Sequence, residues 1–228
     1  MTIFQKSTLF AGALALAIAA CGGGGRDDGD GGTGQAQAQE APRAAPVSAE
    51  QAKRIQAIMI PLIRQMDNPK EAEHVKVTLW DDPHINAANG GDGDFYITTG
   101  LLQKANDDQL RAILAHEIAH EDLGHVAKTQ KIATGLGIGI ALLDQIFPGS
   151  GALTPIAGQL VVSSYSRKEE SEADAHGVTL LKRAGFDGKN MMANTLTWLM
   201  KTEGDGGGGF FASHPATEDR IAAVQRLP

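Results

Sequence analysis

The segment HEIAH, from His116 to His120, constrains the fold of this 228-residue chain more than any other stretch. On an α-helix, residues four positions apart differ by about 40° of rotation and one turn of rise. The two histidines can therefore bind one metal ion side by side if the segment is helical. Zinc suits two neutral imidazoles plus an oxygen ligand, and Glu117 stands where a general base would take a proton from metal-activated water. The segment thus predicts a helix with one zinc ion.

A third ligand is not expected from the same helix. His125 lies nine residues after His116, about 180° around an unbroken helix, so it is expected to point away from the metal. The HExxHxxGxxH pattern of metzincins is excluded, because its glycine and its third histidine are absent at the required positions. Glu121 directly follows His120 at the wrong angle for the same site and is expected to be exposed.

The later segment EESEAD is the best source of a third ligand. Glu170 and Asp174 are four residues apart, so one helix face can present a ligand and, one turn on, an acceptor that orients a zinc histidine through its other ring nitrogen. Asp174 taken alone is equally compatible with a surface charge. Glu169 and Glu172 fall on other faces, where solvated helix charges are expected.

The pattern of the remaining chain predicts an α+β fold that is mostly α. Capping-box or capping residues at Ser48, Asn106 and Ser166 begin helices, and apolar residues recur at helical spacing after them. Alternating residues 75–79 and a β-rich run at 95–99 predict a small sheet. The Gly-punctuated apolar region 132–162 has no uninterrupted run of 18 apolar residues, and we expect buried or surface-dipping helices there.

The N-terminal 47 residues predict export and a lipid anchor. Residues 1–20 have a lysine followed by a short apolar run, which is typical of a signal peptide. The run ends in LAIAAC, which resembles the lipobox of bacterial lipoproteins, so Cys21, the only cysteine, is expected to be lipidated. In that resemblance, Gly22 favours the outer membrane. Residues 21–47 are rich in Gly, Gln and Ala and predict a flexible tether to one folded domain, residues 48–228.

The composition argues against nucleic acid as a partner. The formal net charge is −7, no block of Lys or Arg is present, and only 5% of residues are aromatic. A phosphate-neutralising stripe and a base-stacking platform are therefore both missing from the sequence.

Several segments together resemble a known family. HEIAH, SRKEESEAD followed by HG, the upstream INAANGGDGDFYITTGLL and the late SHPATEDRI match, in order and spacing, the membrane-associated zinc metalloendopeptidases that include HtpX and the type I CAAX prenyl protease. The match spans residues 75–222. The resemblance implies a zincin-like helical domain with a small sheet beside the HExxH helix.

The resemblance also implies a set of site residues. The zinc ligands carry over to His116, His120 and Glu170, with Glu117 as the base and Asp174 orienting a ligand. The chain departs from the family by lacking its integral membrane helices, so it looks like the soluble lipoprotein branch, which acts on periplasmic or outer-membrane proteins.

His214 lies in GDGGGGFFASHP, a Gly-rich loop whose two phenylalanines are expected to be exposed. A histidine there could bind substrate or an oxyanion, or it could occupy the open zinc position and displace the catalytic water. The alternative is a histidine that only caps the last helix before Pro215. Proximity to the metal site is implied mainly by the SHP pattern of the family.

The predicted function is zinc-dependent cleavage of misfolded or misassembled envelope proteins, with possible outer-membrane assembly proteins as partners. Residues Asn86–Asn89 are the candidate edge strand for an extended peptide substrate, with a simple connecting loop as the alternative. A second hypothesis is a periplasmic chaperone or assembly factor with a structural or self-inhibited zinc site. A third is a passive envelope lipoprotein whose histidines are ordinary helix residues.

Overall fold

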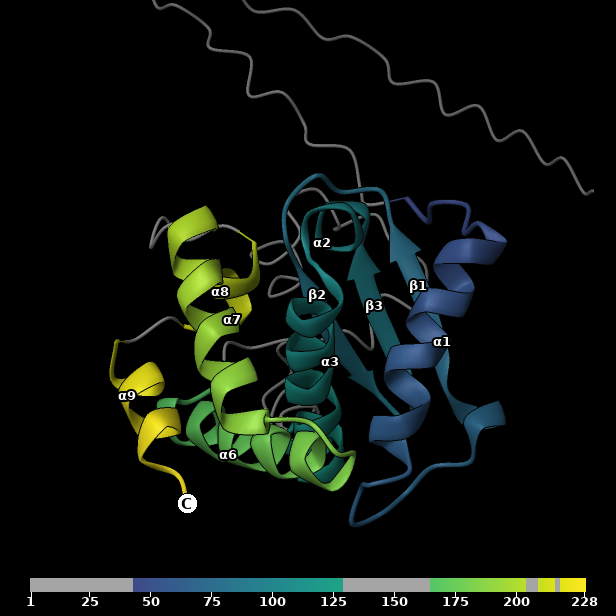
Figure 1. Cartoon of the computed structure of the whole chain (residues 1–228). Helices are drawn as coiled ribbons and strands as arrows, with labels where there is room; N and C mark the ends of the chain where they lie inside the picture. Colours follow the sequence, from purple (N-terminus) through teal and green to yellow (C-terminus); the bar gives the residue numbers. More distant parts are fainter. Residues whose placement is uncertain (1–42, 129–164, 204–208, 216–217) are drawn as a thin grey trace, which may run out of the picture. The chain divides into compact units, whose positions relative to one another are not determined.

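The computed structural model of the chain describes residues 43–128, 165–203, 209–215 and 218–228. All of these residues belong to one unit, Ala38–Pro228, in which helices pack beside a small sheet (Figure 1). The fold is mostly α with a small β component, as the sequence predicts. The predictions for the signal peptide, Cys21, the tether up to residue 42 and the apolar region 132–162 lie outside the described residues. Within the described ranges, no helix is both long enough and apolar enough to cross a bilayer.

Helix α1 (Ala49–Ile63) begins after Ser48, whose hydroxyl accepts a hydrogen bond from the Gln51 N–H. The Gln51 side chain accepts one from the Ser48 N–H in return. This capping box satisfies backbone donors that the first turn of a helix leaves unpaired. Apolar residues at helical spacing bury one face of α1 in the core (Ile55, Ile58, Met59, Leu62 and Ile63).

The sheet has three strands in the order β1-β3-β2. Strand β1 (Lys76–Trp80) is parallel to β3 (Asp94–Thr98), and β2 (Ala87–Gly91) is antiparallel to β3. The hairpin between β2 and β3 turns through Gly91, Asp92 and Gly93, which all have positive φ, a region that glycine adopts without strain. Strand β2 is an edge strand of this sheet and packs against α3. Strand β2 includes every residue of the predicted edge strand Asn86–Asn89 except Asn86.

Helix α3 (Asp107–Asp122) is the central element (Figure 1). Every residue from Leu110 to His120 except Arg111 is buried, because α1, α6, α7 and β2 all pack against this helix. The other elements within the described residues are the short 3-10 helix Ala72–His74, α2 (Thr99–Lys104), α6 (Arg167–Arg183), α7 (Gly188–Glu203), α8 (Phe210–Ser213) and α9 (Glu218–Arg226). The HEIAH segment is therefore helical and enclosed.

Helix α6 approaches α3 closely at Gly177. A Cβ atom at this position would lie 3.3 Å from the Ala115 carbonyl oxygen and 2.9 Å from Cε of Met192. Glycine removes both conflicts, so the backbones of α3 and α6 can meet directly beside His116. This approach places the acidic residues of α6 against the histidines of α3.

The two phenylalanines of α8 are buried, so the prediction that they are exposed is wrong. Phe210 is 1% exposed and Phe211 is 7% exposed. The Phe210 ring stacks on His214 with a centroid distance of 4.4 Å and meets the His116 ring edge to face. Burial of these rings holds the segment that carries His214 against the core.

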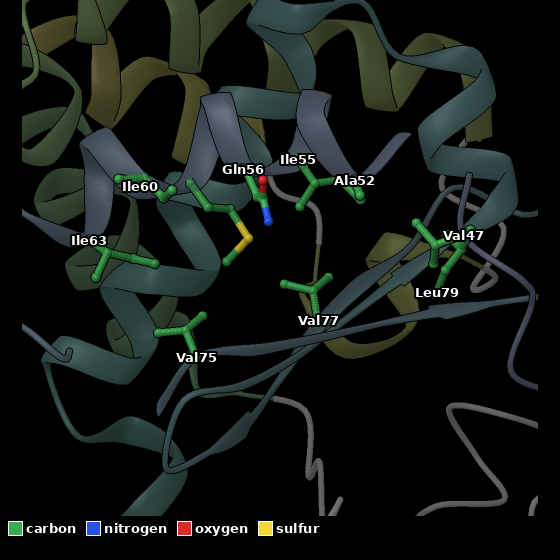
Figure 2. Close-up of a pocket in the computed structure, with 10 residues that line it drawn as sticks. Val47, Ala52, Ile55, Gln56, Ile60, Ile63, Val75, Val77 and Leu79 are labelled. Carbon is green, nitrogen blue, oxygen red and sulfur yellow. The ribbon is translucent and has the colours of Figure 1, made fainter. Parts of the chain in front are cut away.

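A cavity of about 300 Å³ lies between α1 and the sheet (Figure 2). Its lining is apolar apart from Gln56 and comprises Val47, Ala52, Ile55, Gln56, Met59, Ile60, Ile63, Val75, Val77 and Leu79. These residues come from α1 and from the β1 side of the sheet, so the cavity is separate from the buried histidines of α3.

Candidate metal centre

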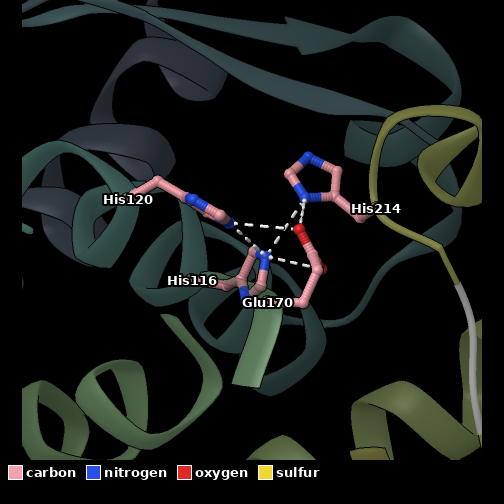
Figure 3. A group of neighbouring side chains, drawn as sticks. All are labelled: His116, His120, Glu170 and His214. Carbon is pink, nitrogen blue, oxygen red and sulfur yellow. Dashed lines mark hydrogen bonds and ion pairs between the residues drawn. The ribbon is translucent and has the colours of Figure 1, made fainter. Parts of the chain in front are cut away.

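Four buried side chains bring their polar atoms together beside α3 (Figure 3). His116 and His120 come from α3, Glu170 comes from α6, and His214 directly follows α8. One donor atom of each lies within 4.8 Å of the others, and each residue is at most 1% exposed. These four residues form the donor cluster. The Nε2 atoms of the two α3 histidines are 3.0 Å apart, which is the side-by-side placement expected from their spacing.

The donor atoms fit a tetrahedral zinc site. Zn–N bonds of about 2.0–2.1 Å separate neighbouring ligand atoms of a tetrahedron by about 3.3–3.4 Å. In this cluster, His116 Nε2 lies 3.6 Å from Glu170 Oε2, and His120 Nε2 lies 3.4 Å from Glu170 Oε1. His214 Nδ1 lies 3.2 Å from His116 Nε2 and 3.0 Å from Glu170 Oε1. Small side-chain shifts would suffice for these residues to hold one metal ion.

The charges of the site favour a divalent cation. Two buried carboxylates, Glu170 and Asp174, contact the buried guanidinium of Arg220, and a third buried carboxylate, Glu117, lies beside His214. They leave two negative charges while the histidines are neutral, and uncompensated buried charge is costly. Burial would raise the pKa of Glu170, but the neighbouring histidines hold it well below its usual range. Burial lowers the pKa of His120 well below 6.5, which favours the neutral imidazole that binds metals.

Glu117 lies beside the donor atoms with a carboxylate that no described residue hydrogen-bonds. Its side chain is fully buried, and Oε1 is 3.3 Å from His214 Nε2. Burial raises the pKa of Glu117, and the nearby His214 and His116 partly offset this effect. A buried carboxylate without a hydrogen-bond donor next to a metal-binding set is suited to accept and return a proton.

Asp174 orients His116, and Arg220 holds Asp174. The Asp174 carboxylate lies 3.0 Å from Nδ1 of His116, the nitrogen that faces away from the donor cluster. Arg220 of α9 donates two hydrogen bonds to Asp174, and its Nη1 lies 2.6 Å from Glu170 Oε2. No local sequence pattern predicted a role for Arg220, although this residue belongs to the SHPATEDRI segment.

His125 is not among the four donor residues, as expected, but the prediction that it lies on the opposite side of the helix is wrong, because it lies next to His120. The prediction assumed an unbroken helix, but α3 ends at Asp122 and Gly124 turns the chain with a φ of 69°. As a result, His125 Nδ1 lies 3.0 Å from Nδ1 of His120. The Tyr165 ring stacks on His120 with a centroid distance of 3.7 Å. The stacking of Tyr165 on His120 is a tertiary contact that no local sequence pattern reveals.

Two further predictions about acidic residues are wrong. The Glu121 side chain is only 6% exposed, because it lies 2.7 Å from Lys70 Nζ and accepts a hydrogen bond from Asn89 of β2. Glu169 is also buried, because it closes the capping box at the start of α6 and accepts a hydrogen bond from Lys128. Both carboxylates have structural partners outside the four donor residues. Glu172, by contrast, is 44% exposed, as expected.

Asp67, Asp122 and His176 form a second group that could hold a metal ion. The Asp122 carboxylate, however, already accepts backbone hydrogen bonds from Asp67 and Asn68 and lies 2.7 Å from His176 Nε2. Asp67 pairs with Arg183. These contacts tie the segment after α1 to α3 and α6, which is a sufficient structural role for the group.

Comparisons with known proteins agree with this site. The sequence pattern described as Peptidase family M48 matches residues 49–227. Metalloprotease LoiP of Escherichia coli is 27% identical over 186 residues, which cover 79% of this chain and 72% of the relative. Metalloprotease YcaL of the same organism is 27% identical over 80% of this chain and 72% of its own length. Protease HtpX of Xanthomonas euvesicatoria is 30% identical over 66% of this chain and 65% of its own length.

Proposed function

Because this chain belongs to peptidase family M48 and is a metalloendopeptidase, we propose that its metal is zinc and that it cleaves misfolded or misassembled proteins of the bacterial cell envelope. The observation that carries the proposal is the buried group of His116, His120 and Glu170 with the carboxylate of Glu117 beside it. Two imidazoles and one carboxylate are a ligand set typical of catalytic zinc in peptidases.

In this proposal, His116, His120 and Glu170 hold the zinc, and Asp174 orients His116 through Nδ1. Zinc bound there supplies Lewis acidity that polarises a peptide carbonyl and makes water nucleophilic near neutral pH. A fourth position is needed for that chemistry. His214 Nδ1 lies among the donor atoms. If His214 occupies this fourth coordination position in the resting enzyme, its side chain must move out of it during catalysis.

Glu117 moves the proton. Its carboxylate takes a proton from the attacking water and returns it to the leaving amine, so that one residue serves as base and then as acid. Burial raises the pKa of this carboxyl, and no described residue donates a hydrogen bond to its oxygens, so they can accept the proton. Complete burial also keeps the side chain from being solvated by bulk water.

The cell-envelope location is supported by the sequence alone. LAIAAC ends in the sole cysteine, and a Gly-rich, apolar-poor tether follows it before the folded domain. We propose that Cys21 carries lipid and that the domain faces the periplasm from the outer membrane. Radiolabelled palmitate should enter the full chain but not a Cys21→Ala variant. Equal labelling of both would show that Cys21 is not the anchor.

Cleavage and zinc content together test the proposed function. The full chain, purified in detergent, should contain one zinc and degrade casein and an unfolded porin. Glu117→Gln should retain zinc and lose about 10² to 10⁴-fold in kcat, because general acid–base catalysis contributes on this scale. Glu73→Gln, a change of an exposed glutamate on the short 3-10 helix, is the matched control and should stay active.

The same measurements of zinc content and cleavage also distinguish an endopeptidase from a chaperone or assembly factor with a self-inhibited zinc site. That alternative is favoured by one observation, the presence of His214 among the donor atoms. Zinc binding and client binding without cleavage, in both the parent chain and a His214→Ala variant, would support the alternative and contradict the endopeptidase.

A further inference from the structure

The ring of His120 is held on three sides. Its Nε2 faces the donor cluster, 3.0 Å from His116 Nε2. The face of the ring stacks on Tyr165 at 3.7 Å between centroids. The remaining nitrogen, Nδ1, lies 3.0 Å from Nδ1 of His125, and His125 itself is only 6% exposed. The contact between the two Nδ1 atoms is a hydrogen bond between two imidazoles, so one ring must donate and the other must accept.

The direction of this hydrogen bond follows from the metal site. A histidine that binds a metal through Nε2 must keep the lone pair there, so its proton is on Nδ1. The Nδ1–H of His120 therefore donates, and Nδ1 of His125 accepts. The proton of the neutral His125 ring is then on Nε2, which lies 3.5 Å from Glu172 Oε2. In this hydrogen-bonded series, His125 thus sets the position of the proton on His120, and Glu172 sets the position of the proton on His125.

Local structure explains why His125 reaches this place. Helix α3 ends at Asp122, and Gly124 adopts a φ of 69° that an L side chain rarely allows. A Cβ at Gly124 would meet no atom within 4 Å, so the glycine is needed for backbone conformation and not for space. The turn brings His125 back against the ring that lies five residues earlier.

The two metal-binding histidines of α3 have different acceptors. His116 has the carboxylate of Asp174 at 3.0 Å from Nδ1, and this carboxylate is held by a buried arginine. His120 has the imidazole of His125, behind which stands Glu172, a half-exposed residue that also pairs with Lys168 at 2.9 Å. Groups that accept from the outer nitrogen of a metal-bound histidine fix its tautomer and its ring orientation.

We propose that His125, supported by Glu172, is a positioning residue that holds His120 in the Nδ1–H tautomer with Nε2 directed at the metal. The inference rests on the proposed function, since it assumes that His120 binds the metal. It adds a residue that the motif HEIAH does not contain, and it gives a role to a histidine whose spacing excludes it as a ligand in an unbroken helix.

Zinc affinity of the full chain tests the role of His125. Competition with a chromophoric chelator should show a zinc dissociation constant about 10 to 100-fold higher for His125→Ala than for the parent, the usual effect of removing an outer-shell partner. His176→Ala is the matched control. His176 is also a largely buried histidine, and it lies 2.7 Å from the carboxylate of Asp122, in a group separate from the four donor residues. The zinc affinity of this control variant should therefore stay within about threefold of the parent.

Rescue variants separate positioning from packing. The Oδ1 atom of asparagine stands in the position of histidine Nδ1 and can accept, whereas the glutamine oxygen corresponds to Nε2 and reaches a different place. His125→Asn should therefore restore most of the affinity, and His125→Gln should remain weak. Glu172→Gln should lower the zinc affinity less than His125→Ala does, because the contact of Glu172 with His125 is long and the Glu172 side chain is 44% exposed. Equal affinity for zinc in His125→Ala and the parent would overturn the inference.

A spectroscopic measurement on the zinc-free chain supplies a second criterion. The ¹⁵N shifts of the His120 ring should show protonated Nδ1 in the parent and in His125→Asn, and a tautomer mixture in His125→Ala. The same Nδ1–H tautomer in all three chains would overturn the inference. If His125→Ala does not fold, the comparison of Asn with Gln decides the question, and equal zinc affinity of these two variants would overturn it. A parent chain that binds no zinc would instead contradict the proposed function itself.

Discussion

Arg220 donates two hydrogen bonds of 2.8 Å to the carboxylate of Asp174, one from Nε and one from Nη2. This fork joins α9 to α6 across 46 residues of sequence, and its third nitrogen lies 2.6 Å from Oε2 of the proposed ligand Glu170. Asp174 in turn lies 3.0 Å from Nδ1 of His116. One buried guanidinium therefore holds both a carboxylate of the donor set and the carboxylate that orients a donor histidine.

Arg220→Met should destabilise the zinc-free chain by about 3–5 kcal/mol, because it leaves the buried Asp174 and Glu170 without their cation. Urea unfolding of the zinc-free protein measures the loss. Arg183→Met removes a more exposed arginine that pairs with Asp67 and should cost less than about 1 kcal/mol. A loss for Arg220→Met as small as that of the control would show that the guanidinium is not needed to hold the carboxylates.

His214→Ala should raise peptidase activity if His214 occupies the fourth position in the resting enzyme. Its Nδ1 belongs to the donor cluster, and its Nε2 lies 3.3 Å from Glu117. Removal of the ring increases the fraction of competent sites, so we expect kcat for casein to rise about three- to tenfold. The exposed His84 provides the control substitution, His84→Ala, which should leave kcat unchanged. An unchanged or reduced rate in His214→Ala would count against inhibition by this residue.

The contribution of Glu169 to the free energy of unfolding should decrease as the pH falls in the acid range. Burial would raise its pKa, but hydrogen bonds from Lys128 and Ser166 outweigh burial and lower the pKa from 4.5 to about 2. A carboxyl with a depressed folded-state pKa stabilises the fold above its unfolded pKa and loses that contribution as pH falls through the folded value. Because Lys128 is largely exposed, we expect only about 1 kcal/mol.

The Glu169→Gln variant tests that contribution by urea unfolding across a pH series. The difference in unfolding free energy between parent and variant should be constant above pH about 5 and should shrink as the pH falls from 4.5 towards 2. Glu172→Gln, on the exposed face of the same helix, controls for loss of helix charge. A difference that does not change with pH would mean that the charge of Glu169 does not contribute.

Features that depend on local chemistry could be predicted from the sequence. Capping residues at Ser48, Asn106 and Ser166 mark the true starts of α1, α3 and α6, because a cap acts within one turn of its helix. The placement of His116 beside His120 follows from helical geometry alone. The resemblance to a zinc peptidase family then brought Glu170 into the same group.

Features that depend on tertiary placement could not be predicted in this way. Arg220 reaches the site only because α9 packs against α6, and no periodicity in the sequence records that contact. The error for His125 came from extending a helix past its real end at Asp122. The error for Glu121 came from judging exposure from one helix, since the partners Lys70 and Asn89 come from other segments.

Native mass spectrometry of the full chain, with casein cleavage followed on the same sample, tests metal-dependent peptidase activity in one experiment. We expect one zinc per chain, loss of cleavage when a chelator removes that zinc, and recovery of both when zinc is returned. A Glu170→Gln variant should bind zinc at least 10-fold more weakly, since one ligand charge is removed. Cleavage of casein by a chain that carries no metal would show that the protein is not a metal-dependent peptidase.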